Sequence, residues 1–226
     1  MSEARWVIAI DGPAGAGKST VAKLLASRLG LRYLDTGAMY RALALVASRR
    51  GLGPEDGEAV AAILEQTRID FAEGDPQRVL VNGEDVTAAI RTPDIGELAS
   101  ALSVFSAVRR QMVARQQGLI AEGGFTLEGR DTTTVVAPNA DLKVFLTASL
   151  EERAKRRHAE LQERGIEIGY GDLLRQISDR DHRDYTRPDS PLQVAPDALT
   201  LESFGIPPEV VVQQIEDALG RKSNSA

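Results

Sequence analysis

Residues 6–30 read WVIAIDGPAGAGKSTVAKLLASRLG, and this stretch decides the fold. It opens with an apolar run at residues 6–10, which is typical of a buried strand and stops at Asp11 and Gly12. Apolar side chains then recur at helical spacing through residues 18–29, and Gly30 follows as a stop signal. A buried strand, a glycine-rich loop and a helix, in that order, predict the start of an α/β domain with parallel strands.

The loop between the strand and the helix, GPAGAGKS, matches the phosphate-loop pattern in full. Glycines let the backbone curl so that its N–H groups point at phosphate oxygens, and the helix adds the positive end of its dipole. Lys18 can reach the β- and γ-phosphates of ATP, and the Ser19 hydroxyl can ligate Mg²⁺. The flanking strand and helix distinguish this motif from a chance glycine-rich turn. We therefore predict an ATP phosphate site at Gly12, Ala14, Gly15, Ala16, Gly17, Lys18, Ser19 and Thr20.

Composition restricts the class of protein. The 226 residues, 42% of them hydrophobic, suit one globular domain, and no apolar run is long enough to span a membrane. The chain has no cysteine, which excludes disulfides and thiolate metal sites. A net charge of −6 argues against a general nucleic-acid binder, and the polar residues 1–5 do not look like a secretory signal. We expect a cytoplasmic monomer that binds neither nucleic acid nor membranes.

The rest of the chain continues the α/β pattern around a different middle part. Short strands are predicted at residues 68–71 and 78–82, so a small β-rich lobe is expected between about residues 66 and 90. Elsewhere, hydrophobic periodicity and capping signals predict strands at residues 32–35, 125–128, 142–147 and 198–201, and helices at residues 38–50, 94–103, 107–122, 150–164, 172–185 and 207–220.

Polar residues 35–41, DTGAMYR, directly follow the second predicted strand. In an open parallel sheet, ligands bind at the carboxyl edge of the strands, so this segment is a candidate for the acceptor side of a site. Thr36 can hydrogen-bond a phosphate or a base edge, and Arg41 can meet an acceptor phosphate or remain a solvated surface residue. Core packing explains Tyr40 equally well.

A second charged group, Glu128-Gly129-Arg130-Asp131, ends the next core strand. Charged residues at the carboxyl end of a strand indicate a site rather than core packing. Arg130 suits an acceptor phosphate, and Asp131 suits a Mg²⁺-bound water or a ribose hydroxyl. The alternative is a structural ion pair at the edge of the sheet.

Residues 153–187 are dense in arginine. Arg153 and Arg157 are four residues apart and would share a helix face, and Arg180, Asp184 and Arg187 follow at i, i+4 and i+7. This stripe follows a flexible Gly-Tyr-Gly segment and indicates a mobile lid. The alternative is an ordinary solvated helix with internal ion pairs, each worth roughly 0.3–0.5 kcal/mol.

Other phosphate-loop proteins fit the sequence less well. It has no apolar strand ending in Asp-Glu, as a motor ATPase would have, and no Asn-Lys-x-Asp run, as a GTPase would have. A chain of this size has room for little beyond a sheet and lids, which favours a small-molecule kinase.

Several motifs together resemble the bacterial cytidylate kinases, in the same order and over nearly the whole chain. They are GPAGAGKS at residues 12–19, DTGAMYR at 35–41, NGEDVT at 82–87, IRT at 90–92, GRD at 129–131, RDHRDYTR at 180–187 and PL at 191–192. The resemblance implies a nucleoside monophosphate kinase fold with three layers: a parallel five-stranded core sheet with flanking helices, a small β-containing monophosphate-binding insert and a helical lid.

The resemblance also implies a division of this chain into one kinase domain with inserted parts. The core would comprise about residues 1–65, 104–150 and 192–220, the insert about residues 66–103, and the lid about residues 153–190. The implied reaction moves the γ-phosphoryl group of ATP to CMP or dCMP with Mg²⁺, in pyrimidine metabolism.

Site residues follow from the same resemblance. Lys18, Arg130, Asp131 and Arg187 would act in catalysis, Arg153 and Arg157 would belong to the lid, and Ser19 would hold Mg²⁺, with Asp131 acting through water. CMP would bind to Thr36, Tyr40, Arg41, Ser100, Arg109, Arg130, Asp131, Arg180, Asp184 and Arg187. By their sequence context alone, Ser100 and Arg109 would be assigned to a helix surface.

The chain departs from the family pattern after Asp131, where an aliphatic residue and a glycine are expected and Thr132 and Thr133 stand instead. Thr133 adds a Cβ at a position where the backbone is expected to need the freedom of glycine, and we expect catalytic rate or nucleotide preference to differ but not the fold. Two alternatives stay open: a kinase for another small acceptor such as AMP, UMP or shikimate, and a nucleotide-sensing module without turnover.

Overall fold

The computed structural model describes residues 5–72, 74, 77–163 and 165–223. The predicted polar start at residues 1–4 and the predicted helix end at residue 164 lie outside these ranges. The described chain falls into two compact units. The first contains the residues up to Leu34, Leu119–Thr186 and the residues from Ser190 onward, and the second contains Asp35–Gly118 with Arg187–Asp189.

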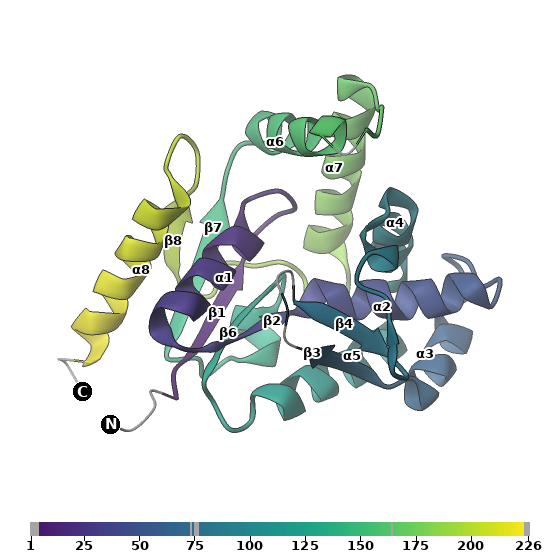
Figure 1. Cartoon of the computed structure of the whole chain (residues 1–226), viewed down its shortest axis with the longest axis horizontal. Coiled ribbons are helices and arrows are strands. Elements are labelled where there is room, and N and C mark those ends of the chain that lie inside the picture. Colours follow the sequence, from purple (N-terminus) through teal and green to yellow (C-terminus); the bar gives the residue numbers. More distant parts are fainter. Residues whose placement is uncertain (1–4, 73, 75–76, 164, 224–226) are drawn as a thin grey trace. The chain divides into compact units, whose positions relative to one another are not determined.

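The first unit is built on a five-stranded sheet in the order β2-β6-β1-β7-β8 (Figure 1), which confirms the predicted parallel core. Strand β1 (Val7–Asp11) pairs in parallel with β6 (Phe125–Gly129) and with β7 (Leu142–Thr147), and β7 pairs in parallel with β8 (Leu199–Glu202). Strand β2 (Arg32–Asp35) forms the other edge. Ile8, Ala9 and Ile10 are fully buried because β1 is central and covered on both faces.

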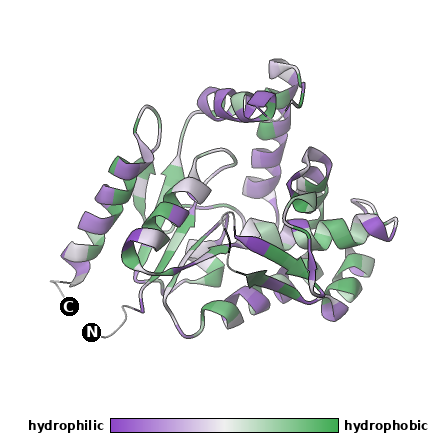
Figure 2. Ribbon diagram, viewed as in Figure 1, coloured by the Kyte–Doolittle hydropathy of each residue, from purple (hydrophilic) through white to green (hydrophobic). Residues whose placement is uncertain are grey.

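The helices of the first unit bury apolar faces in two clusters. Helices α1 (Lys18–Leu29) and α8 (Pro208–Ser223) share a core with strands β1 and β7. Helices α6 (Leu150–Glu163) and α7 (Tyr170–Thr186) pack on each other through Ala154, Leu161, Leu173 and Ile177. Figure 2 shows the strands of the sheet as mostly apolar and α6 and α7 as mostly polar, so these two helices depend on a narrow apolar seam.

The second unit combines helices with a small sheet. Its helices are α2 (Thr36–Arg49), α3 (Gly57–Gln66), α4 (Pro93–Leu102) and most of α5 (Ser106–Ile120), with a short 3₁₀ turn at Ala89–Arg91. The antiparallel sheet contains β3 (Ile69–Ala72), β4 (Arg78–Val81) and β5 (Glu84–Asp85). Its first two strands lie where the sequence predicts them, and β5 extends the predicted turn at Asn82-Gly83.

Three local features differ from the sequence prediction. Helix α3 is not predicted at all. Helix α7 begins at Tyr170, whereas the capping signal at Asp172 predicted a later start, so Asp172 lies inside the first turn and pairs with Arg175 there. A π-helical turn, η2 (Thr132–Val136), follows Asp131. Within the described residues, positive φ outside glycine occurs at Asn82 and Ser190, so the backbone at Thr133 does not need the freedom of glycine that was expected there.

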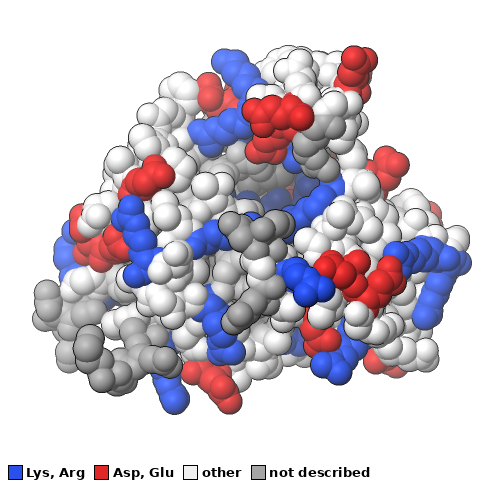
Figure 3. All heavy atoms as spheres, viewed as in Figure 1, with Lys and Arg blue, Asp and Glu red and all other residues white. Residues whose placement is uncertain are grey.

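The predicted boundaries of the insert and of the lid remain predictions. In the described part of the chain, the helices are all too short or too polar to cross a membrane. On the face drawn in Figure 3, basic and acidic side chains are interspersed. Exposed pairs such as Arg49–Glu84 and Arg78–Asp85 are examples of this mixing in the second unit.

Candidate active site

The phosphate loop connects β1 to α1 and has the backbone conformation that its glycines allow. Gly12, Gly15 and Gly17 have φ values of 150°, 78° and 88°. A methyl group on Gly12 would lie 1.9 Å from the carbonyl oxygen of Leu146, so the loop begins pressed against the backbone of β7. Gly17 precedes α1 without a side-chain cap, and the N–H groups of the first helical turn have no acceptor within the helix. This is an anion-binding geometry.

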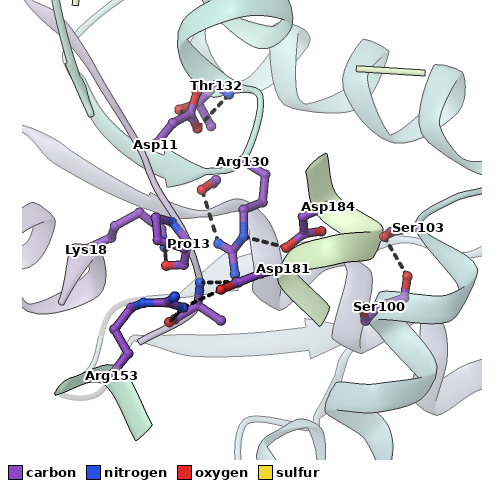
Figure 4. A network of polar contacts seen from close by, with 12 residues as sticks. Asp11, Pro13, Lys18, Ser100, Ser103, Arg130, Thr132, Arg153, Asp181 and Asp184 are labelled. Carbon is purple, nitrogen blue, oxygen red and sulfur yellow. Dashed lines mark hydrogen bonds and ion pairs between the residues drawn. The ribbon is translucent and has the colours of Figure 1, made fainter. Parts of the chain in front are cut away.

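Lys18 is buried at the base of this loop. Its Nζ donates to the carbonyl oxygen of Pro13 at 2.8 Å (Figure 4). Burial lowers the pKa of Lys18 to about 7, the cations Arg130 and Arg180 act in the same direction, and Glu128 opposes the shift. The ammonium group is therefore poised to gain stability from an anion placed beside it.

Ser19 donates a hydrogen bond from its hydroxyl to Oε1 of Glu128, which also accepts a bond from Tyr33 at 2.9 Å. Glu128 is buried at the end of β6. The sequence analysis assigned no role to this residue, although it belongs to the charged group at that strand end. A hydroxyl beside a carboxylate is an oxygen donor set that suits Mg²⁺, which keeps several waters and needs few protein ligands. Within the described ranges no larger cluster of metal-ligating side chains occurs.

Helix α6 contacts the phosphate loop through Arg153, and Arg156 of the same helix lies near Gly17 of the loop. Arg153 is buried, donates to the carbonyl oxygen of Ala14 at 2.9 Å, and pairs with Asp181 of α7 at 2.6 Å (Figure 4). Arg156 binds the carbonyl and hydroxyl oxygens of Ser203, and a methyl group on Gly17 would lie 3.8 Å from it. The sequence analysis missed Arg156, which lies one turn from Arg153.

The other predicted lid residue of α6, Arg157, is partly exposed and pairs with Glu160 at 3.0 Å. The fold therefore brings Arg153, but not Arg157, to the phosphate loop. The lid roles of both residues stay predictions.

Arg130 and Asp184, both predicted for CMP, are brought together in the first unit. Their Nε and Oδ2 atoms lie 2.8 Å apart, and both side chains are largely buried (Figure 4). Asp131, which directly follows Arg130 in sequence, is buried, and Arg180 is close enough to contribute to the lowered pKa of Lys18. Four of the residues predicted to bind CMP, namely Arg130, Asp131, Arg180 and Asp184, thus belong to the same unit as the phosphate loop.

The carboxylate of Asp11, the last residue of β1, is fully buried and accepts bonds from Thr132 and Thr133. Burial raises the pKa of Asp11, the bonds from Thr133 and Thr132 oppose this, and the nearby Asp131 adds to it.

Arg41 lies in the second unit beside Asp35, the residue that caps α2. Oδ2 of Asp35 accepts from Arg41 at 2.8 Å and from Arg91 at 3.1 Å, and Oδ1 accepts from the Ala38 N–H at 2.7 Å. Burial alone would raise the pKa of Asp35, but Arg41 and Arg91 outweigh it and lower the pKa. Two guanidinium groups that share one carboxylate suit a phosphate group. Arg91 was quoted only as part of a motif and had no predicted role.

A second group in the same unit contains Tyr40, Arg109 and Ser100. The guanidinium of Arg109 lies 5.6 Å from the centre of the Tyr40 ring and donates to the Ser103 carbonyl at 3.1 Å. The Ser103 hydroxyl donates to the Ser100 carbonyl at 2.8 Å. Ser100 and Arg109 are both buried, so the helix-surface alternative is wrong for them. Thr36 and Arg187 are buried in this unit as well.

A parallel sheet with a phosphate loop after its central strand, and a buried lysine at the base of that loop, defines the class of phosphate-loop proteins that bind nucleoside triphosphates. The solved structure of a gluconokinase from Sinorhizobium meliloti shares this fold, with a TM-score of 0.52 at 15% identity over 98% of this chain and 95% of the other.

The family follows from sequence. The family model described as cytidylate kinase matches residues 8–220. A cytidylate kinase from Carboxydothermus hydrogenoformans is 46% identical over 96% of this chain and 98% of its own length. One from Geobacter sulfurreducens is 44% identical over 97% and 94%. The chain belongs to the cytidylate kinase family, and it is a nucleoside monophosphate kinase.

Proposed function

We propose that this protein transfers the γ-phosphoryl group of ATP to CMP or dCMP, producing ADP and CDP or dCDP. The observation that carries the proposal is the phosphate loop with Lys18 buried at its base, in a chain of the cytidylate kinase family. The names of the relatives support the acceptor, and the loop supports the donor.

On the donor side, the loop N–H groups and Lys18 would bind the β- and γ-phosphates of ATP. Phosphoryl transfer depends on positioning and on neutralising the charge of the transferred group, more than on covalent chemistry by the protein. Lys18 contributes a charge that is disfavoured in the free protein and becomes favoured beside phosphate. Arg130 and, by the resemblance, Arg187 would supply further positive charge.

Magnesium fits the oxygen donors at the start of α1. Ser19 would ligate the ion, Glu128 is placed to hold the Ser19 hydroxyl, and the role of Asp131 through water stays part of the proposal. When bound, Mg²⁺ would neutralise charge on the phosphate oxygens of ATP.

On the acceptor side, Arg41 is proposed to bind the CMP phosphate, and Arg91 is added to the predicted set because it shares Asp35 with Arg41. Ser100 and Arg109, which are buried, and Tyr40, which is partly buried, form a group that suits the nucleoside. The acceptor residues implied by the resemblance are completed by Thr36, Arg130, Asp131, Arg180, Asp184 and Arg187. A phosphate acceptor is already anionic at neutral pH, so no general base is required.

The proposal extends to the setting of the enzyme. We propose a monomer acting in cytoplasmic pyrimidine nucleotide metabolism. Sedimentation of the purified protein tests the monomer, because a mass of twice 24.3 kDa would contradict it.

One assay tests the reaction itself. ADP formation from ATP and Mg²⁺ is measured with CMP, dCMP, UMP and AMP in turn. We expect turnover with CMP and dCMP at least about tenfold above that with AMP, which corresponds to about 1.4 kcal/mol of discrimination. Higher turnover with AMP would assign another acceptor, and no acceptor-dependent ADP would favour a nucleotide-sensing module.

A further inference from the structure

Asp11 and two consecutive threonines form a closed hydrogen-bond group. Oδ1 of Asp11 accepts from the N–H and hydroxyl of Thr132 at 2.9 and 2.7 Å (Figure 4). Oδ2 accepts from the N–H and hydroxyl of Thr133 at 2.7 and 2.6 Å. A carboxylate offers about four lone-pair sites, so this group saturates it. All three residues are at most 1% exposed. A buried carboxylate with four donors holds its donors firmly, since each lost bond leaves a desolvated charge.

The group joins the two segments that carry the chemistry of the first unit. Asp11 directly precedes Gly12, where the phosphate loop begins against the backbone of Leu146. Thr132 directly follows Asp131 and is two residues beyond Arg130. Strands β1 and β6 run in register up to the pair Asp11 and Gly129, and beyond it the chain leaves both strands. The Asp11 carboxylate thus connects the phosphate loop to the Arg130–Asp131 turn just beyond the point where the pairing of β1 with β6 ends.

The threonine hydroxyls supply half of the four bonds. An aliphatic residue and a glycine, which the family resemblance leads one to expect here, would leave only the two backbone donors. The hydroxyls are therefore a feature of this chain, and they act at the turn that carries Arg130, whose guanidinium binds Asp184.

We infer that Asp11, with the hydroxyl groups of Thr132 and Thr133, is a positioning device that holds the Arg130–Asp131 turn at the root of the phosphate loop. Its effect on rate rests on the proposed kinase function. A shift of about 1 Å in a positioned group can cost up to about 100-fold in rate, so loosening this turn affects the reaction more than the binding of ATP.

The test compares four isosteric or conservative variants: Thr133→Val, Thr133→Ser, Thr132→Val and Thr134→Val. Thr134 is the matched control, because it lies in the same turn and its hydroxyl has no hydrogen-bond partner in the part of the chain that the structure describes. For each variant, kcat and the KM for ATP are measured with CMP, well below the lowest melting temperature. Hydrogen exchange of residues 129–136 is measured without substrates.

We expect Thr133→Val and Thr132→Val each to lower kcat by about fivefold to tenfold, with the KM for ATP within about twofold. Amide exchange in residues 129–133 should rise in both. Thr133→Ser should restore kcat to within about twofold, and Thr134→Val should match the unmodified protein in every readout.

Three results would overturn the inference: an unchanged kcat in Thr133→Val although its melting temperature falls, an equal loss in Thr134→Val, or unchanged exchange in both valine variants. Should the unmodified protein turn over no acceptor, the proposed function fails, and the exchange data alone decide the inference. Faster exchange in Thr133→Val than in Thr134→Val then supports it, and equal exchange contradicts it.

Discussion

The phosphate loop and the acceptor residues of the second unit are built in opposite ways. The loop is eight consecutive residues whose backbone N–H groups are the binding groups, and its glycines are needed for their φ values. The acceptor residues Asp35, Arg41, Arg91, Ser100 and Arg109 are side chains spread over about 75 positions. A site made by a contiguous backbone can be recognised from sequence, whereas a site assembled from distant side chains is specified by tertiary packing.

The largest expected effect is on the loop. Lys18→Ala should lower kcat by about 100- to 1,000-fold, because a buried charge aimed at the transferred phosphate is lost. The protein should stay folded, since Lys18 is buried at a cost in solvation. Steady-state kinetics and circular dichroism provide the measurement. Arg28→Ala on the same helix, whose side chain pairs with Glu216, is the control and should retain full turnover. Near-normal turnover of Lys18→Ala would remove the loop from the mechanism.

Arg153 and Arg157 test whether the loop depends on side chains outside its motif. Arg153→Ala should lower the free energy of unfolding by about 3 kcal/mol, because it leaves the buried Asp181 without its ion-pair partner and removes a bond to Ala14. Arg157→Ala should change it by less than about 0.5 kcal/mol, since its pair with Glu160 is exposed. Urea denaturation measures both. Equal effects would show that α6 does not anchor the loop.

Arg41→Ala tests the acceptor residues of the second unit, which are dispersed along the sequence. We expect the KM for CMP to rise by about 10- to 100-fold, because a charge-assisted bond to phosphate is worth roughly 1.5–3 kcal/mol. The KM for ATP should stay within about twofold. Arg49→Ala, at the exposed end of the same helix, is the control. A rise in the KM for ATP that equals the rise for CMP would contradict the assignment.

The smallest expected effect is a pH dependence of the kcat/KM for ATP that arises from Lys18 in the phosphate loop. With the pKa of Lys18 lowered to about 7, the free protein loses this charge as the pH rises. The kcat/KM for ATP should therefore fall about fivefold from pH 7 to pH 8, and the kcat profile should be shifted to higher pH. The free energy of unfolding should instead rise with pH above 7. The reason is that folding must remove the proton from Lys18 or bury its charge, and this becomes less costly as the pH approaches the ordinary lysine pKa of 10.5. A flat kcat/KM profile would contradict this account.

The same contrast explains how much of the molecule could be predicted. The parallel sheet, the loop and most helices follow from apolar runs and stop signals, and the structure confirms them. Helix α3 was missed. The roles suggested here for Glu128 and Arg91 also remained unpredicted, because a charged residue acquires a role only through a partner that folding brings to it. The expected need for glycine at position 133 was wrong for the same reason: the π-helical turn gives Thr133 an ordinary backbone and a bond to Asp11.

The central claim is that the loop binds the donor and the second unit contributes the acceptor residues. Calorimetric titration of ADP alone and of CMP alone into the unmodified protein, Lys18→Ala and Arg41→Ala tests it most directly. We predict that Lys18→Ala weakens the affinity for ADP at least about tenfold and leaves the affinity for CMP within about twofold. Arg41→Ala should weaken the affinity for CMP at least about tenfold and leave the affinity for ADP within about twofold. A variant that weakens both nucleotides equally, or an Arg41→Ala protein that binds CMP normally, would contradict the account.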